Sequence, residues 1–233
     1  MARLARLSVA GMPHLLVQRS HPAQAVFVDD TDRTLFRQLL GEAARSEGVA
    51  LHAYALFDRE LRLLATPSTA EALGRMMQSL GRRYGGAFNR RHGRTGGLWE
   101  GRFRATVIEP ERYLVAAMFY VEEDCGWEGG SETAGQAVLT SSRGYHLGRW
   151  QDALVTDHPV FWALGNTPFD REAAYRGRLS AGLAPGDRSD LEQGVLKGWP
   201  VGSTAFVEML SGRTSRRLAP LKRGRPRKMP ATK

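Results

Sequence analysis

The chain has 233 residues, enough for one substantial core with room for a smaller unit. Hydrophobic residues make up 42%, and the absence of a run of about 18 apolar residues argues against a membrane-spanning helix. The opening segment lacks the apolar core and cleavage site of a signal peptide, and the single cysteine, Cys125, excludes an intrachain disulfide. We therefore expect a cytoplasmic protein.

Basic residues are concentrated in two blocks. The net charge is +9, and residues 213–233 hold nine Lys/Arg and no acid, so the remainder of the chain is nearly neutral. Residues 75–104 hold eight arginines against one acid, Glu100. Two basic blocks on a balanced background predict a polyanion partner contacted at two places. Solvated surface arginines are the alternative, whereas the tail has too few apolar residues for binding to a membrane surface.

The first half of the chain alternates strand and helix patterns. A helix begins at Asp30 or Thr31 and ends at Gly48, where a glycine C-cap fits. In chain order the elements are a strand at 13–18, that helix, a hairpin of 52–57 and 61–65, a helix at 70–90, a strand at 102–108 and a helix at 109–124. This order predicts an α+β, ferredoxin-like split βαβ fold, an antiparallel sheet with helices on one face.

The second half has a helical region and a basic tail. Short helices are expected at 157–164, 170–183, 189–197 and 203–210, and the last two flank a Gly-Trp-Pro-Val-Gly turn. These two form either a helix-turn-helix or, as the spacing favours, a helical hairpin. The tail is too polar to pack and is expected to be disordered. The predicted organisation is a ferredoxin-like domain at 1–127, a linker at 128–137, a helical region at 138–212 and the tail at 213–233.

Several segments, in their order and spacing, carry a family resemblance over most of the chain. They are MARLARL and GMPHLLVQR at the start, VFVDD, HAYAL, AFNRRHGR, GLWEGRF, the helix with Tyr113-Leu114 and Tyr120-Val121, and Gly198-Trp199 with the basic run 222–228. Together they resemble the REP-associated tyrosine transposases of the HUH single-tyrosine group. That family binds a divalent metal through two histidines that flank one residue on a strand, and its tyrosine attacks a DNA phosphate.

The resemblance breaks at the metal ligands. By register from Tyr54 and Pro67, Glu60 and Arg62 occupy the two histidine positions. Arginine stays protonated and has no lone pair for a cation, so these positions look degenerate. Because alternate strand residues share a face, the two side chains can form an ion pair. Tyr120 occupies the nucleophile position; a tyrosine packed on the sheet is the alternative.

The resemblance implies a transposase-like protein that binds hairpin single-stranded DNA and is impaired in metal-dependent nicking. No cofactor is expected on this reading. The alternative is an active transposase that uses Tyr120 with Mg²⁺ or Mn²⁺, with Arg62 or a displaced ligand in place of the histidine pair. A residual carboxylate metal site of Glu60 and Asp124 is a separate alternative. A third reading is a related fold that binds RNA or another acidic partner. Monomers and homodimers both remain open.

Arginines interleaved with aromatic residues suit a single strand, through phosphate contacts and base stacking. Trp99 is the stacking candidate, whereas Tyr84 and Phe88 are expected in the helix core. In the tail, Arg223-Gly224-Arg225-Pro226-Arg227 resembles an AT-hook, and phosphate binding without sequence preference is equally open. The candidate DNA-contacting residues are Arg82, Arg83, Arg90, Arg91, Arg94, Trp99, Arg102, Arg104, Lys222, Arg223, Arg225, Arg227 and Lys228.

Overall fold

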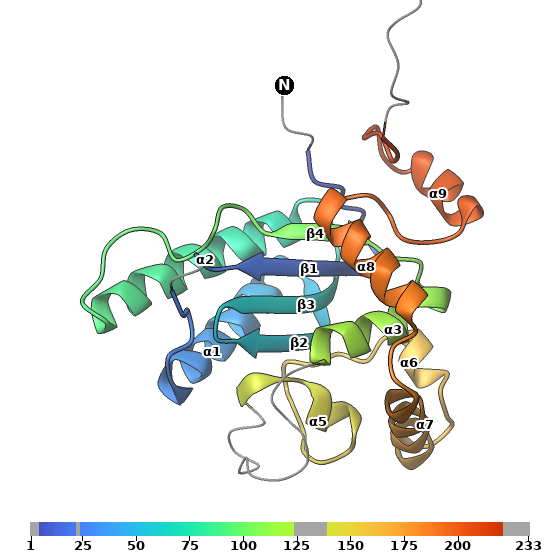
Figure 1. Ribbon diagram of the computed structural model, residues 1–233, viewed down its shortest axis with the longest axis horizontal. Coiled ribbons are helices and arrows are strands. Elements are labelled where there is room, and N and C mark those ends of the chain that lie inside the picture. Colours follow the sequence, from blue (N-terminus) through green and yellow to red (C-terminus); the bar gives the residue numbers. More distant parts are fainter. Residues whose placement is uncertain (1–4, 22–23, 124–138, 221–233) are drawn as a thin grey trace, which may run out of the picture.

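A four-stranded antiparallel sheet forms the centre of the protein. The computed structural model describes residues 5–21, 24–123 and 139–220 (Figure 1). The strands are β1 (His14–Arg19), β2 (Val49–Phe57), β3 (Glu60–Pro67) and β4 (Arg104–Val107). Their order in the sheet is β2-β3-β1-β4, and all neighbours pair antiparallel. This is the order of a split βαβ unit, so the expected α+β, ferredoxin-like arrangement is confirmed.

Two crossover helices, α1 (Asp30–Glu47) and α2 (Ala72–Arg91), cover one face of the sheet. The N-cap of α1 is Asp29, whose side chain accepts from the Asp32 amide, so the cap lies one residue before the expected Asp30. Gly48 closes α1 at φ 65° as predicted, in the left-handed region where a side chain would be strained.

Helices also cover the opposite face of the sheet, whereas the sequence predicted helices on one face only. Leu16 of β1 lies in the core under α1 and α2, whereas Leu15 and Val17 lie in a second core under α3 (Pro110–Glu122). A strand buried on both faces has an uninterrupted apolar run in place of an alternating pattern. The sheet is therefore the middle layer of three.

The C-terminal helices belong to this second layer and its surroundings (Figure 1). They are α5 (Arg143–His146), α6 (Pro159–Trp162), α7 (Pro168–Ala181), α8 (Pro185–Lys197) and α9 (Thr204–Ser211). The sequence did not indicate α5. Leu191 and Val195 of α8 join the core under α3, whereas Phe206 and Leu210 of α9 pack with the N-terminal segment in a separate cluster. Since α8 and α9 pack on different partners, the expected helical hairpin does not form. The predicted linker lies outside the described residues.

Both edges of the sheet contact chain from the C-terminal half. Leu51 and Ala55 of β2 form bridges with Val155 and Ser141. At the other edge, the Val201 amide donates to the Val107 carbonyl at 2.9 Å, and the Glu109 amide donates to the Val201 carbonyl at 2.8 Å. The edge strands therefore have hydrogen-bonding partners from sequence far downstream.

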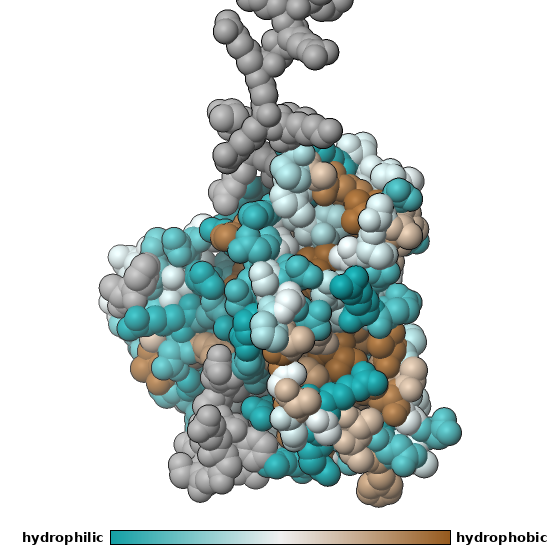
Figure 2. Space-filling view, turned by 45° about the vertical axis from the view of Figure 1, so that its right-hand side comes forward, coloured by the Kyte–Doolittle hydropathy of each residue, from teal (hydrophilic) through white to brown (hydrophobic). Residues whose placement is uncertain are grey.

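Exposed apolar side chains are dispersed over several elements. Figure 2 shows brown patches interrupted by teal ones on the face that brings the right-hand side of Figure 1 forward. Trp162, Phe169, Leu196 and Met209 are large apolar side chains more than a third exposed, and they belong to four different helices. Within the described ranges, no helix has the length and apolarity needed to cross a membrane.

We expect the fold to lose stability as pH falls from about 6.5 to 4, because two histidines are buried neutral. Burial lowers the pKa of His14, hydrogen-bonded to the Met12 carbonyl, and of His52, hydrogen-bonded to the Thr156 carbonyl, each to about 4. The unfolded chain takes up these protons first, near pH 6.5, so acid favours unfolding. Each shift corresponds to roughly 3 kcal/mol at full effect.

Urea unfolding at pH 7, 5.5 and 4.5 measures this loss. His52→Gln keeps a polar side chain at the same place and should remove about half of the decline. Replacing the exposed His21 by glutamine is the control and should leave the pH dependence unchanged. A free energy of unfolding that stays constant between pH 7 and 4.5 would contradict the assignment.

Candidate functional site

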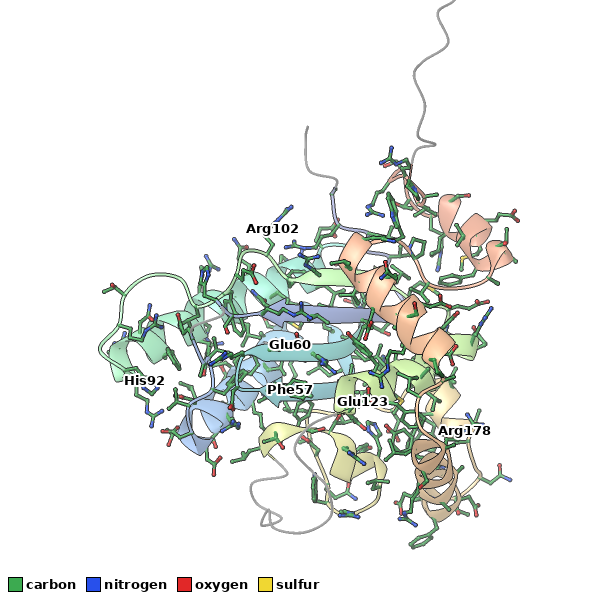
Figure 3. The ribbon with its side chains drawn as sticks, viewed as in Figure 1. Phe57, Glu60, His92, Arg102, Glu123 and Arg178 are labelled. Atoms are coloured by element: carbon green, nitrogen blue, oxygen red, sulfur yellow. The ribbon has the colours of Figure 1, made fainter. Side chains whose placement is uncertain are left out.

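The two degenerate ligand positions lie together on β3. Glu60 and Arg62 alternate along β3 with Leu64, which lies in the core under α3, so they share that face of the strand as their two-residue spacing predicts. The Arg62 Nε lies 2.6 Å from the Glu60 Oε1, which confirms that the two side chains form an ion pair. Figure 3 shows Glu60 near Phe57 at the end of the β2–β3 hairpin.

Tyr120 of α3 is brought next to this pair. The Arg62 guanidinium lies 4.9 Å from the centre of the Tyr120 ring and 4.6 Å from that of Phe57, so two aromatic rings flank it. Its Nη1 also donates to the Tyr120 backbone carbonyl at 2.8 Å. The Arg62 side chain is only 18% exposed, so these contacts hold its guanidinium in one place.

A second arginine completes the group. Arg19, at the end of β1, pairs with Glu60 in the β1–β3 register, and its Nε lies 2.5 Å from the Glu60 Oε2. This hydrogen bond is the main reason that the pKa of Arg19 is raised. The Arg19 side chain is 64% exposed, so this guanidinium faces solvent. The sequence did not reveal Arg19, because its proximity to Glu60 depends on strand register.

The residues present do not fit a divalent cation. Both oxygens of the Glu60 carboxylate accept from guanidinium groups, and Arg62 offers no lone pair. A metal ion at this point would meet two fixed positive charges. In the part of the chain that the structure describes, no three His, Cys, Asp or Glu side chains are grouped to hold a metal ion. Asp124 lies outside the described residues.

Tyr120 itself is packed and protonated. Its side chain is in the core under α3, and the residue is 6% exposed. Burial raises its pKa, Arg62 opposes that rise, and Glu60 reinforces it. Among the described residues, no side chain forms a hydrogen bond with its hydroxyl that would take up its proton. A phenol in this state is a poor nucleophile.

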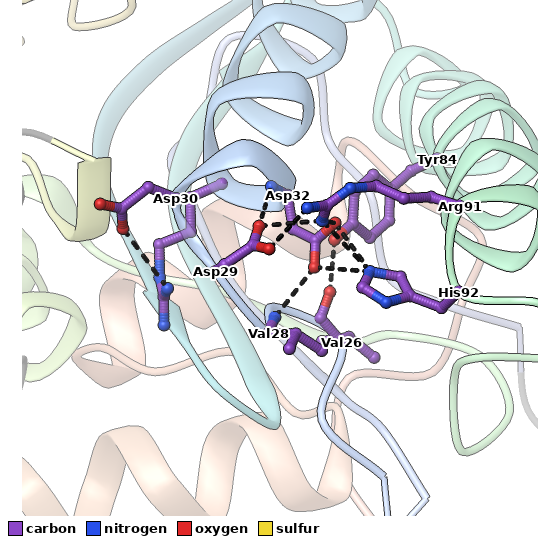
Figure 4. Close-up of polar contacts among 9 residues, drawn as sticks. Val26, Val28, Asp29, Asp30, Asp32, Tyr84, Arg91 and His92 are labelled. Carbon is purple, nitrogen blue, oxygen red and sulfur yellow. Dashed lines mark hydrogen bonds and ion pairs between the residues drawn. The ribbon is translucent and has the colours of Figure 1, made fainter.

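Five of the eight arginines of the first basic block are engaged within the fold. Arg75 pairs with Glu47 of α1 at 2.5 Å. Arg91 contacts Asp29 and Asp32 of the α1 N-terminus, each at 2.5 Å, and His92 also contacts Asp32 at 3.0 Å (Figure 4). Arg83 pairs with Glu42 of α1 at 2.5 Å. These contacts join α1 to α2. The Arg94 Nη2 donates to the Gln24 Oε1 at 2.7 Å, and Arg104 donates to the Leu196 carbonyl at 3.1 Å.

The rest of that block is divided between distant places. Arg82, Arg90 and Arg102 are exposed. Figure 3 shows His92 at the far end of α2 and Arg102 beside β4, so the block does not form one surface.

The expected aromatic residues are mostly core. Tyr84 and Phe88 are buried as predicted, and Trp99 is half-buried against the same cluster, with its ring centre 6.4 Å from that of Phe36. Trp99 therefore packs at the boundary of the core, and its ring is not a free platform for base stacking. The candidate tail residues Lys222, Arg223, Arg225, Arg227 and Lys228 lie outside the described residues.

Comparisons with known proteins give similarity of structure only. No known family model and no curated protein sequence matches the chain. A REP-associated tyrosine transposase, solved bound to a REP hairpin, is similar at a TM-score of 0.47 and 15% identity, over 69% of this chain and 96% of that one. A Deinococcus radiodurans R1 protein described as a candidate transposase is similar at a TM-score of 0.36 and 22% identity, over 49% of this chain and 92% of that one.

Proposed function

We propose that this chain is a transposase-like DNA-binding protein that recognises structured or single-stranded DNA without nicking it. The observation that carries the proposal is the position of Arg62. Its guanidinium is fixed between Phe57, Glu60 and Tyr120, where the resembled family would place a metal ligand. A fixed positive charge can attract a phosphate, but it cannot accept electron pairs from it as a metal ion does.

Arg19 supports the binding half of the proposal. Arg19 and Arg62 share one carboxylate, so the group of three side chains carries one net positive charge. The exposed Arg19 guanidinium has further N–H donors that can reach an incoming phosphate oxygen. The neutral Tyr120 beside them is suited to packing and not to attack.

The test is incubation of the full chain with labelled hairpin-bearing single-stranded DNA, with and without Mg²⁺ or Mn²⁺. We expect a shifted complex on a native gel, and no covalent adduct or cleavage on a denaturing gel. Tyr120→Phe should bind as the wild type does, because only the hydroxyl is removed.

A metal-dependent covalent band that Tyr120→Phe abolishes would replace the proposal with the active transposase alternative. An RNA hairpin of the same sequence serves as the competitor. Displacement of the DNA by RNA at a lower concentration than by unlabelled DNA would favour the RNA-binding reading. Absence of any shifted complex would remove the DNA-binding proposal.

A further inference from the structure

A small basic hollow lies away from Tyr120, where the N-terminal segment, β4 and the end of α8 meet. Its volume is about 180 Å³. It is lined by Arg6, Arg102, Arg104, Lys197 and Arg216, and no acidic residue is among its lining residues. Five cations from four separate stretches of sequence therefore converge on one depression.

Backbone carbonyls hold three of these cations in place. The Arg216 Nε donates to the Ala5 carbonyl at 2.6 Å and its Nη2 to the Gly198 carbonyl at 2.7 Å. The Arg104 Nη1 donates to the Leu196 carbonyl at 3.1 Å, and the Arg6 Nε to the Phe103 carbonyl at 3.0 Å. Carbonyl groups orient a guanidinium without neutralising it, so the positive charge of the hollow persists.

An aromatic ring also holds Arg216. Its guanidinium stacks 5.2 Å from the centre of the Trp199 ring, and Arg217 stacks on the same ring at 5.6 Å. Burial lowers the pKa of Arg216, and the neighbouring Arg217 lowers it further. Within the described ranges, Arg102, Arg104, Lys197 and Arg216 take part in no salt bridge.

The negative end of the α8 helix dipole offsets only part of the positive charge of the hollow. Carbonyls at a helix C-terminus attract cations, and Leu196 and Gly198 accept from Arg104 and Arg216. The C-terminal end of a helix carries roughly −0.5 elementary charge. The four cations without a salt bridge exceed that charge about eightfold, so the hollow retains a strong attraction for an anion.

We propose that this hollow is a second contact site for the phosphate backbone of the DNA. The inference rests on the proposed function. Phosphodiester groups are strong, weakly basic acceptors that match guanidinium donors, and a polyanion can satisfy several cations at once. The position of the hollow adds to this, because the basic run 222–228 begins six residues after Arg216 in the sequence. The tail and the hollow can therefore engage one DNA molecule together.

The test removes the charges of two residues that do not hold another element of the fold in place. Arg102 and Lys197 are exposed and line the hollow, so the variant is Arg102→Gln with Lys197→Gln. The matched control is Arg45→Gln with Arg178→Gln. It lowers the net charge equally, at exposed last-turn positions of α1 and α7 that do not line the hollow. Figure 3 shows Arg102 in the upper part of the view and Arg178 at its lower right.

Hairpin DNA affinity of the full-length proteins is measured from 0.05 to 0.4 M NaCl by fluorescence anisotropy. Each lost phosphate contact should lower affinity about 5–8-fold at 0.1 M salt and flatten the salt slope by about 0.7–0.9. The hollow variant should therefore lose about 25–60-fold. The control should stay within about twofold of the wild type, with an unchanged slope.

The outcomes separate the two proposals. Wild-type binding with an unaltered slope in the hollow variant overturns the hollow and leaves the proposed function standing. A wild type that binds no DNA overturns both. A further arm replaces chloride by inorganic phosphate at constant ionic strength. Phosphate should weaken wild-type binding more than binding by the hollow variant, because it competes with the DNA backbone for the hollow. An equal effect on the two proteins would contradict the assignment.

Discussion

Replacing Glu122 by alanine is expected to lower the free energy of unfolding by about 3–5 kcal/mol, as for a broken buried charge network. Its carboxylate is buried in α3 and accepts from the Ser142 hydroxyl at 2.5 Å, from His146 at 2.7 Å and from the Tyr175 hydroxyl at 2.6 Å. These partners lie before α5, in α5 and in α7. Alanine removes the acceptor that these three buried polar groups share.

The neighbouring Glu123 supplies the control, since it pairs with Arg188 and is half-buried. Glu123→Ala should cost about 1 kcal/mol or less, as partly exposed pairs do. Both variants are compared with the wild type by urea unfolding at pH 7. A loss below about 1 kcal/mol for Glu122→Ala would show that the network contributes little.

Neutralising the basic tail is expected to have the largest effect on DNA binding. The run 222–228 holds five Lys/Arg, and glutamine at all five removes their charge and keeps the chain length. If every one contacts a phosphate, affinity at 0.1 M salt should fall by about 3.5 to 4.5 orders of magnitude, with a flatter salt dependence. Equal binding at every salt concentration would contradict the role of the tail.

A charge-preserving variant tests how the tail binds. Gly224→Ala with Pro226→Ala keeps all five cations and changes the Gly-Arg-Pro centre that resembles an AT-hook. Minor-groove insertion needs a slim, extended backbone, so a hook should lose its preference for A·T-rich duplex in this variant. Unchanged binding to A·T-rich and G·C-rich duplexes would favour contacts to phosphates alone.

Local patterns were sufficient to predict the sheet and its two crossover helices. Turn residues, caps and apolar spacing place these elements within a few positions. The second core was missed, although the signal was present. The run Ala53-Tyr54-Ala55 is apolar at every position, with Tyr54 in one core and its neighbours in the other. Such a run predicts a strand covered on both faces.

The site was predictable only where its geometry is local. The ion pair of Glu60 and Arg62 follows from strand alternation, whereas the contact of Arg19 requires the strand register. The charges of residues 75–104 alone suggested arginines without ion-pair partners, but Arg83 and Arg91 pair with acidic residues of α1. The basic hollow joins residues as far apart as Arg6 and Arg216, a proximity that only tertiary structure reveals.

The downstream residues that bridge β2 and β4 also bear on solubility. An uncovered edge strand can pair with the edge of another molecule and start aggregation. Here Ser141 and Val155 occupy one edge, and Val201 extends past the other. A nascent chain that ends before residue 139 has both edges open until these segments emerge. Such intermediates are where we expect self-association during synthesis, and where chaperones would be needed most.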